Sequence, residues 1–199
     1  MAMTRSRTRD PERKQRILAS AAALGARHGF HAISMTDIGS DAGIVGSGIY
    51  RHFDSKTSIL VAMLDQGMAR LAGRAAEIIA AGGSPARILA ELVRDHIAAA
   101  IEDRDVLAVY HMEAHTLPEA DQRRLRRAQR HYVEEWVHLL APLRPDLADA
   151  ELRLTVHAAI GAIQSTLFFR SGLADDRQAA LLQVMAHSCL GIAPVGRDT

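Results

Sequence analysis

The stretch Ser34-Met-Thr-Asp-Ile-Gly-Ser-Asp-Ala-Gly-Ile-Val-Gly-Ser-Gly-Ile-Tyr-Arg-His-Phe-Asp-Ser-Lys56 decides the fold of this chain. It predicts a helix that begins at Ser34, a glycine turn at Gly43, a short second helix over residues 45–52 and a further helix that begins near Lys56. Two short helices at a steep angle, the second with a polar tip, have the shape that enters a DNA major groove. The stretch therefore predicts a helix-turn-helix that binds DNA.

Charge and cysteine content limit the class of protein. Residues 1–60 hold nine Lys and Arg against five Asp and Glu, a net of +4, whereas the remaining residues hold 15 against 18, a net of −3. This asymmetry favours an anionic partner for the N-terminal part. A single cysteine, Cys189, excludes an internal disulfide framework and fits a reducing compartment.

The sequence carries no signal for export or for a membrane. Arg5, Arg7 and Arg9 are followed by no apolar run, so we expect no signal peptide. The apolar stretch over residues 154–169 is interrupted by His157 and Gln164, which makes it too polar and too short for a membrane span. We therefore expect a soluble, cytoplasmic protein.

Helical periodicity extends along almost the whole chain, and no alternating strand pattern interrupts it. Ser34 and Asp37 have the spacing of a capping box, Ser55 is placed to cap the long helix that follows it, and Ser84-Pro85 fits the start of another helix. We expect nine helices, over residues 11–28, 34–43, 45–52, 55–81, 86–102, 105–116, 119–141, 148–170 and 175–192. The predicted fold class is all-α, with an N-terminal three-helix helix-turn-helix domain joined through a long fourth helix to a larger helical body.

The two helices around Gly43 share a small predicted core. Four apolar residues are spaced to pack beneath the turn, namely Ile38, Ala42, Ile44 and Ile49. Gly43 lies where the chain reverses, a place that commonly needs a positive φ. Phe53 is expected to be buried. The residues left pointing outward are Thr36, Val45, Gly46, Ser47, Tyr50 and His52.

The N-terminal third resembles the TetR family of bacterial transcriptional regulators. The matching residues are Ile17-Leu18-x-x-Ala21-Ala22-x-Leu24, Gly29-Phe30, Ser34-Met35-x-Asp37-Ile38, Ala42-Gly43-Ile44, Ile49-Tyr50-x-His52-Phe53 and Ser55-Lys56. The resemblance implies a homodimer whose N-terminal domains bind an operator and whose body binds a small ligand and dimerises. It divides the chain into a disordered basic arm (1–10), a helix-turn-helix domain (11–56) and a ligand-binding and dimerisation domain (57–199).

The resemblance also assigns the DNA contacts. Ser34, Thr36, Tyr50, His52 and Lys56 would contact phosphates, which fixes register but reads no sequence. Val45, Gly46 and Ser47 would face the bases. Many family members carry serine at the position of Val45, a Gly-Thr or Gly-Ser pair at Ser47-Gly48, and Glu at Thr57. These departures leave little capacity for direct base readout, so we expect specificity to depend on DNA shape and on the basic arm.

The body is expected to hold a ligand pocket and a dimer interface. The most informative pocket candidates, within residues 86–140, are His96, Tyr110, Met112, Glu113, Tyr132 and Trp136. The last two predicted helices carry apolar stripes, Leu152, Val156, Ile160, Ile163 and Leu167 on one and Leu181, Met185, Cys189 and Ile192 on the other. In the family the last two helices form a four-helix dimer interface; the alternative is that these stripes fill the core of one protomer.

Two further features have competing interpretations. His111 and His115 are four residues apart, a spacing that can bind Zn²⁺, but no third ligand lies at a convincing spacing, so we expect no metal. The basic run over residues 122–130 is either a solvated helix face or a site for the anionic tail of a ligand. Some relatives with a comparable segment respond to acyl-CoA thioesters, so an acyl-CoA-like effector is included among the expected ligands.

The sequence thus predicts a homodimeric, ligand-responsive repressor of a palindromic DNA operator. The alternative is an architectural or partner-regulated DNA-binding protein that has no small-molecule ligand. An enzyme is not expected, because no catalytic triad, phosphate-binding glycine loop or paired carboxylates appear, and Cys189 has apolar neighbours. No cofactor is expected.

Overall fold

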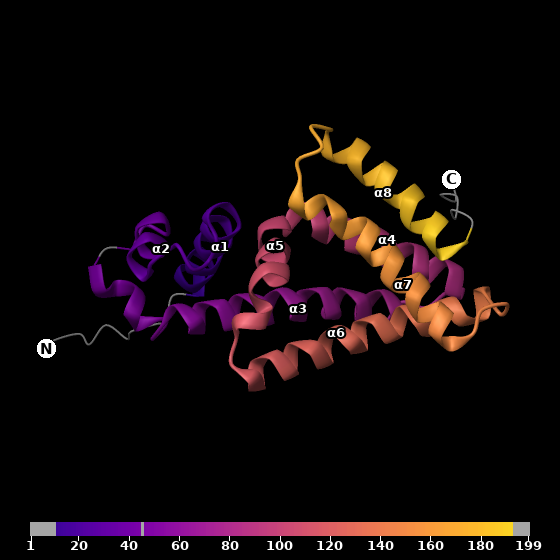
Figure 1. Ribbon diagram of the computed structural model, residues 1–199, viewed down its shortest axis with the longest axis horizontal. Coiled ribbons are helices and arrows are strands. Elements are labelled where there is room, and N and C mark those ends of the chain that lie inside the picture. The colour runs from indigo at the N-terminus through magenta and orange to yellow at the C-terminus, as the bar shows by residue number, and fades with distance from the viewer. Residues whose placement is uncertain (1–10, 45, 193–199) are drawn as a thin grey trace, which may run out of the picture. The chain divides into compact units, whose positions relative to one another are not determined.

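The computed structural model describes residues 11–44 and 46–192, and all regular structure within these ranges is helical (Figure 1). The predictions for the arm over residues 1–10 and for Val45 lie outside the described residues. The α-helices are α1 Pro11–His28, α2 Met35–Asp41, α3 Lys56–Ala80, α4 Pro85–Glu102, α5 Arg104–Glu113, α6 Glu119–Leu140, α7 Asp149–Gln164 and α8 Asp175–Leu190. Short 3-10 helices are η1 Gly46–Arg51, η2 Ala114–Thr116, η3 Ala141–Leu143 and η4 Ser165–Phe168.

Serine side chains begin three of these helices, as their spacing predicts. The backbone N–H of Asp37 donates to Ser34 Oγ at 3.1 Å, and the backbone N–H of Ser34 donates to the Asp37 carboxylate at 2.8 Å. Ser55 Oγ accepts from the N–H of Ser58 at the start of α3, and Ser84 caps α4 just before Pro85. Each cap satisfies backbone donors that have no partner inside the helix.

The chain divides into two compact units, residues 1–63 and residues 64–199. The long helix α3 contributes its first two turns to the N-terminal unit and the rest to the second unit, which we call the body. The core of the N-terminal unit is made by apolar residues of α1, the loop that follows it, α2, η1 and the start of α3. Its members include Ile17, Phe30, Ile38, Ala42, Ile49, Phe53 and Ile59. The predicted core positions are therefore buried, except that Ile44 is half-buried.

The short helix predicted over residues 45–52 is present over residues 46–51, where it is the 3-10 helix η1 rather than a regular α-helix. Two glycines in six residues lower the propensity for a regular α-helix. At Gly48, an added Cβ would lie 2.8 Å from Ile44 Cγ2, so this position requires the absence of a side chain. Gly43 has φ +68°, the positive value that the turn was predicted to need.

The body is built around α4. This helix contacts α5, α6, α7 and α8, and nine of its eighteen residues are buried. Helices α7 and α8 pack against each other along their lengths (Figure 1). The largest fully buried side chain of the body is Trp136 of α6. The burial of α4 on several sides explains why its sequence is apolar on more than one face.

The helix predicted over residues 148–170 is shorter in the structure, because α7 ends at Gln164 and continues as the 3-10 helix η4. The guanidinium of Arg104, at the start of α5, donates to the carbonyl oxygens of Thr166 and Leu167 at 3.1 Å and of Phe169 at 3.0 Å. These carbonyls belong to the end of a helix and lack helical partners. Arg104 therefore stabilises the end of η4, the 3-10 continuation of α7.

One of the two predicted interface stripes, that of α7, needs correction. Leu152, Val156, Ile160, Ile163 and Leu167 are all buried within the protomer. The exposed face of α7 carries Leu154 and small residues instead, and the exposed face of α8 carries Val184, Met185 and Cys189. The sequence pattern identified a buried stripe but could not say which neighbour buries it. Among the described residues, no helix is both long and apolar enough to cross a lipid bilayer.

Candidate functional site

The N-terminal unit presents several predicted DNA-contacting side chains at its surface. Thr36, Ser47 and Tyr50 are exposed, and the Tyr50 side chain is 54% accessible although it is aromatic. His52 is half-buried. Ser34 is exposed but its hydroxyl donates to Asp37 at 2.7 Å, so its main local role is to begin α2. An exposed tyrosine beside hydroxyl and imidazole groups is suited to hydrogen bonding with phosphate oxygens.

Lys56 has a structural role that the sequence did not indicate. Its Nζ donates to the carbonyl oxygens of His31 at 3.0 Å and Ile33 at 2.8 Å, and it lies 5.5 Å from the centre of the Phe30 ring. These contacts hold the loop between α1 and α2 against the start of α3. An ammonium group has three donors, so one N–H remains after these two hydrogen bonds.

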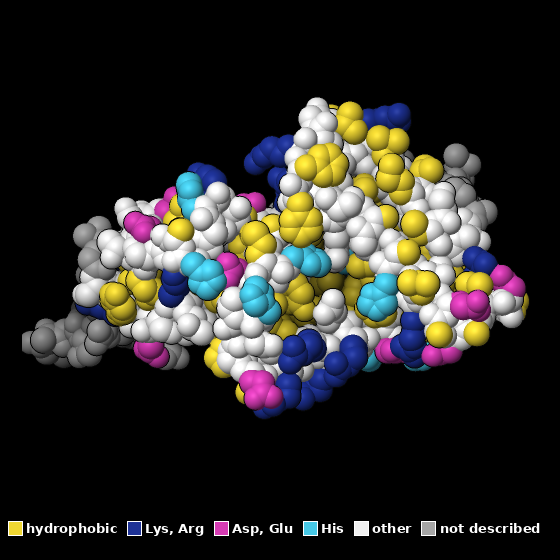
Figure 2. Space-filling view, in the orientation of Figure 1, with side chains coloured by type: hydrophobic (Ala, Val, Ile, Leu, Met, Phe, Trp, Pro, Cys, Tyr) yellow, Lys and Arg dark blue, Asp and Glu magenta, His cyan; other side chains and the backbone are white. Residues whose placement is uncertain are grey.

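The body contains a cavity of about 290 Å³. Five helices supply its walls, from α3 to α7. The lining residues are Leu64, Gly67, Met68, Leu71, His96, Val106, Leu107, Tyr110, His111, Gln129, Tyr132, Val133, His157, Ile160, Gly161 and Gln164. Figure 2 shows histidine side chains gathered around a hollow with hydrophobic walls, and basic side chains gathered over α6 below it. A mostly apolar cavity with a few polar groups is the usual form of a small-molecule site.

The structure brings together three of the six predicted pocket residues. His96, Tyr110 and Tyr132 line the cavity. Trp136 does not line it but packs behind the lining, with its ring 5.9 Å from that of His96 and 6.1 Å from that of Tyr132.

Met112 and Glu113 also lie outside the lining, with Met112 exposed and Glu113 buried elsewhere. Both follow His111 on α5, and the helical period of 3.6 residues turns their side chains away from the face that borders the cavity.

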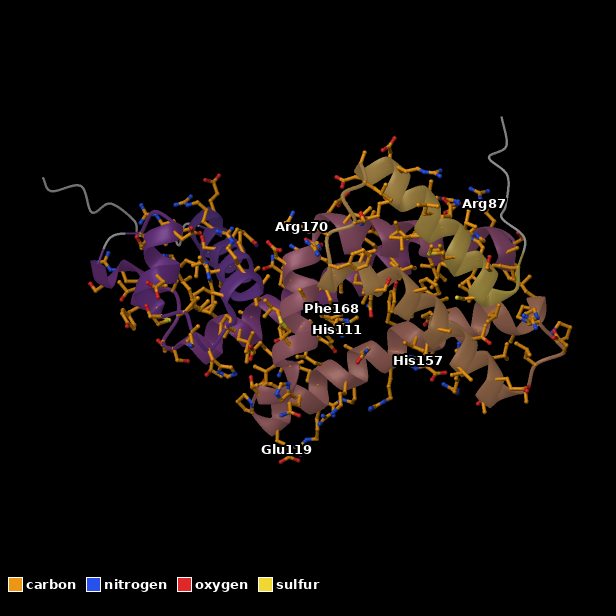
Figure 3. The ribbon with its side chains drawn as sticks, turned by 45° about the horizontal axis from the view of Figure 1, so that its top comes forward. Arg87, His111, Glu119, His157, Phe168 and Arg170 are labelled. Atoms are coloured by element: carbon orange, nitrogen blue, oxygen red, sulfur yellow. The ribbon has the colours of Figure 1, made fainter. Side chains whose placement is uncertain are left out.

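Sequence reasoning missed four polar lining residues, His111, Gln129, His157 and Gln164. His157 and Gln164 had been noted only because they interrupt an apolar stretch. Polar residues recurring within an otherwise apolar helix were the available signal, since such positions need a polar partner when buried. Figure 3 shows His111 beside Phe168, and their rings lie 5.8 Å apart.

A chain of hydrogen bonds connects four helices at the polar end of the cavity. His111 Nε2 of α5 lies 3.1 Å from Gln164 Oε1 of α7. Gln164 Nε2 lies 3.2 Å from His96 Nε2 of α4, and His96 Nδ1 lies 3.0 Å from the hydroxyl oxygen of Tyr132 on α6. Because an amide nitrogen only donates, His96 Nε2 accepts and its proton is on Nδ1, from which it donates to Tyr132.

Burial favours the neutral forms of the ionisable groups in and beside this series of hydrogen bonds. Burial, together with the smaller effect of the nearby His111, lowers the pKa of His96 from its ordinary 6.5 to about 4. Partial burial also lowers the pKa of His111, and burial raises the pKa values of Tyr110 and Tyr132. Desolvation disfavours the charged form in each case.

Helix α6 carries arginines near the cavity that differ in their partners. Arg124 donates to Asp65 at 2.6 Å and to Asp121 at 2.7 Å, and Arg123 pairs with Glu119. Among the described residues, no carboxylate pairs with Arg126 or with the two later arginines of the run, Arg127 and Arg130. Arg126 donates to the neutral side chain of Gln122 and lies close enough to Tyr110 to oppose the rise in its pKa.

The motifs of the N-terminal unit and the helical body together define a class of protein. The model of bacterial regulatory proteins of the tetR family matches residues 17–63, and the model of the tetracyclin repressor-like C-terminal domain matches residues 82–167. The chain therefore belongs to the TetR family. It is a family of regulatory proteins rather than of enzymes.

Individual relatives refine this class. The transcriptional repressor KstR2 of Rhodococcus jostii is 34% identical over 101 residues, which are 51% of this chain and 50% of that protein. The matched part of this chain thus spans about half the length of that relative. The structure of the ketosteroid regulator KstR2 of Mycobacterium tuberculosis superposes with a TM-score of 0.78 at 23% identity, covering 90% of this chain and 93% of the other. The structure of AibR in complex with isovaleryl coenzyme A and operator DNA superposes with a TM-score of 0.75 at 18% identity, covering 92% and 100%.

Proposed function

We propose that this protein is a homodimeric transcriptional repressor that releases a palindromic operator when a small, partly apolar effector enters the body. The observation that carries the proposal is the cavity of about 290 Å³ in the same chain as a helix-turn-helix of the TetR family. An architectural protein without a ligand has no need for such a cavity, whose lining combines apolar walls with hydrogen-bonding groups.

Residues 11–56 are proposed as the DNA-binding domain and residues 57–199 as the ligand-binding and dimerisation domain. Within the first, Ser34, Thr36, Tyr50, His52 and Lys56 would contact phosphates, and Val45, Gly46 and Ser47 would face the bases. The exposure of Thr36, Ser47 and Tyr50 supports this role. The two recognition helices of a dimer would read half-sites about 34–36 Å apart.

The exposed faces of α7 and α8 support the proposed dimer. Leu154 is 71% exposed, and Val184 and Met185 are 58% and 50% exposed. Ala158, Gly161 and Ser165 are exposed on the same side of α7 as Leu154, at intervals of three or four residues. Small residues with apolar neighbours allow helices of two protomers to approach closely and bury this surface.

Helix α3 supplies a route from the cavity to the DNA-binding domain. Its residues Leu64, Gly67, Met68 and Leu71 line the cavity, and the same helix begins at Lys56 in the N-terminal unit. An effector that displaces α3 at the cavity moves the end of the helix as well. To convert an equilibrium of 1:99 to 99:1, the effector must prefer one conformation by about 5.5 kcal/mol.

The effector is proposed to be amphipathic and similar to an acyl-CoA. Its apolar part would occupy the cavity, and its anionic part would lie on the arginines of α6 that pair with no carboxylate of the described residues, Arg126 and Arg130 in particular. AibR, which has the same fold, was solved with isovaleryl coenzyme A. A guanidinium that is not engaged by a carboxylate can pair with phosphate oxygens.

The proposal is tested in two stages. The operator is first selected from a random DNA pool with the full-length protein, and its affinity is measured by fluorescence anisotropy. A panel of acyl-CoA thioesters, with coenzyme A alone as the control, is then tested for release. Arg126→Gln combined with Arg130→Gln should raise the concentration needed for release at least tenfold, whereas Arg123→Gln, which removes an arginine already paired with Glu119, should change it less than twofold. Operator binding that no panel member or metabolite extract weakens would contradict a ligand-responsive repressor.

A further inference from the structure

At its inner end the cavity offers a ligand hydrogen bonds but no charged side chain. Seven of its lining residues are polar, and none of the described lining residues is Lys, Arg, Asp or Glu. The titratable groups at its inner end, His96 and Tyr132, are buried and neutral. A carboxylate or ammonium group placed there would lose its hydration without gaining a counter-charge, which is costly.

Gln164 lies at the centre of the polar end. Its Oε1 accepts from His111, and one N–H of its Nε2 donates to His96 Nε2. A primary amide has two N–H donors, so the second N–H of Gln164 is left over from these two contacts. Gln164 lines the cavity, and its two hydrogen-bond partners, His111 and His96, hold its amide in place.

The orientation of the Gln164 amide and the tautomer of His96 are linked. His96 is fully buried, and its Nε2 lies 3.2 Å from the amide nitrogen of Gln164, so Nε2 accepts and the single ring proton lies on Nδ1, toward Tyr132. If the amide were reversed, its oxygen would face His96 Nε2. That arrangement would require each hydrogen bond from His111 to Tyr132 to be donated in the opposite direction. In the observed arrangement the cavity therefore meets a hydrogen-bond donor from Gln164.

We infer that the cavity selects an effector whose buried part carries an uncharged acceptor oxygen, such as the carbonyl of a ketone, ester or thioester, and that Gln164 is the residue that recognises it. Free carboxylates are rejected. This inference rests on the proposed function, because it assigns the chemistry of the same effector site. Any charged group of the effector remains outside, over the arginines of α6.

The test uses three probes of nearly equal size that differ at one position. They are 4-phenyl-2-butanone, its hydrocarbon counterpart butylbenzene, and 3-phenylpropionate, in which a carboxylate oxygen replaces the ketone methyl group. Binding to the full-length protein is followed by the fluorescence of Trp136, the single tryptophan of the chain, which packs against His96 and Tyr132. The ketone is expected to bind at least tenfold more tightly than the carboxylate.

Gln164→Leu removes the amide but keeps a side chain of similar size. It therefore distinguishes hydrogen bonding by the amide from the shape of the cavity. The ketone should lose about fivefold in affinity, as expected for one neutral hydrogen bond, whereas butylbenzene should change less than twofold. Unchanged butylbenzene binding also shows that the variant keeps its cavity. Gln178→Leu is the matched control, since Gln178 of α8 accepts a hydrogen bond from Ser171 and lies outside the cavity lining.

Three results would overturn the inference: equal binding of ketone and carboxylate, an equal loss for ketone and butylbenzene in Gln164→Leu, or no binding of any probe. The proposed function is tested separately by operator release. If release by an effector persists while Gln164→Leu has no selective effect, only the assignment of Gln164 fails. If no effector releases the operator although the ketone binds selectively, the repressor proposal fails and the assignment stands.

Discussion

In the N-terminal unit the candidate DNA-binding side chains face solvent, whereas in the body the candidate effector site lies inside and its polar groups hydrogen-bond to one another. Tyr50 represents the first arrangement, with over half of its surface exposed. His96 represents the second, with 1% exposed and hydrogen bonds to both Tyr132 and Gln164. The side chains of the surface site depend on an external partner for their hydrogen bonds, whereas the interior site forms most of its hydrogen bonds internally and leaves one N–H of Gln164 for a ligand.

The two sites therefore differ in how much their side chains contribute to the stability of the fold. A side chain that contacts only solvent contributes little to stability, so its replacement affects binding alone. A buried group that belongs to a hydrogen-bonded chain contributes to both stability and binding. Lys56 is intermediate, because it is proposed to contact DNA and also holds the loop between α1 and α2. The following predictions test whether buried side chains act mainly on stability, exposed ones on binding alone, and Lys56 on both.

Trp136→Ala should have the largest effect. Trp136 has no exposed surface, and its removal leaves a cavity beside His96 and Tyr132. We expect the free energy of unfolding to fall by about 3–5 kcal/mol, measured by urea denaturation. Met112→Ala, at an exposed position on α5, is the control and should cost less than about 1 kcal/mol. A loss below about 1 kcal/mol for Trp136→Ala would mean that the interior site is not part of the stable core.

Acidification should destabilise the body through His96. Its pKa is about 4 in the folded protein and 6.5 when unfolded, so the unfolded chain binds the proton first as the pH falls. The stabilising contribution is fully present above pH 6.5 and is lost between pH 6.5 and 4, with a total of about 3 kcal/mol. His96→Gln should flatten the dependence of the unfolding free energy on pH over this interval. An unchanged slope in the variant would contradict the assignment to His96.

Lys56→Gln should affect both stability and DNA binding. Loss of the contacts with the carbonyls of His31 and Ile33 is expected to cost about 1–3 kcal/mol. The logarithmic dependence of DNA affinity on salt should also become shallower, by about 0.9 for one lost phosphate contact, on all sequences alike. Lys14→Gln removes the other lysine that lies over an aromatic ring, that of Phe53, and serves as the comparison. A loss of stability with an unchanged salt slope would assign Lys56 to structure alone.

Tyr50→Phe should have the smallest effect and should be confined to binding. The exposed hydroxyl has no partner among the hydrogen bonds of the N-terminal unit described above, so thermal unfolding should not change by more than about 1 °C. Operator affinity should fall about threefold to tenfold, as for one hydrogen bond, measured by fluorescence anisotropy. A change in unfolding temperature without a change in operator affinity would contradict the assignment of Tyr50 to DNA binding alone.

Local features of the structure were predictable in detail. The capping serines Ser34, Ser55 and Ser84 start helices as expected, and Gly43 has the positive φ that its turn needs. Errors appeared where neighbours decide between similar local conformations. Residues 46–51 form the 3-10 helix η1, and α7 ends at Gln164 and continues as η4, whose last carbonyls accept hydrogen bonds from Arg104 of α5.

The candidate effector site was predictable only in part. His96, Tyr110 and Tyr132 were identified, but Met112, Glu113 and Trp136 do not line the cavity, and His111, Gln129, His157 and Gln164 were missed. Helical period shows which residues share a face, but not whether that face borders a cavity or another helix. The same ambiguity led the buried stripe of α7 to be considered for the dimer interface.

The sequence by itself determined the helix-turn-helix, because its caps, turn and core lie within 23 consecutive residues, from Ser34 to Lys56, and depend on local backbone preferences. Only the tertiary structure decided the cavity and the hydrogen-bonded chain of His111, Gln164, His96 and Tyr132. Those four residues are separated by up to 68 positions and come from four helices. Their association depends on how α4, α5, α6 and α7 pack together, which no local pattern specifies.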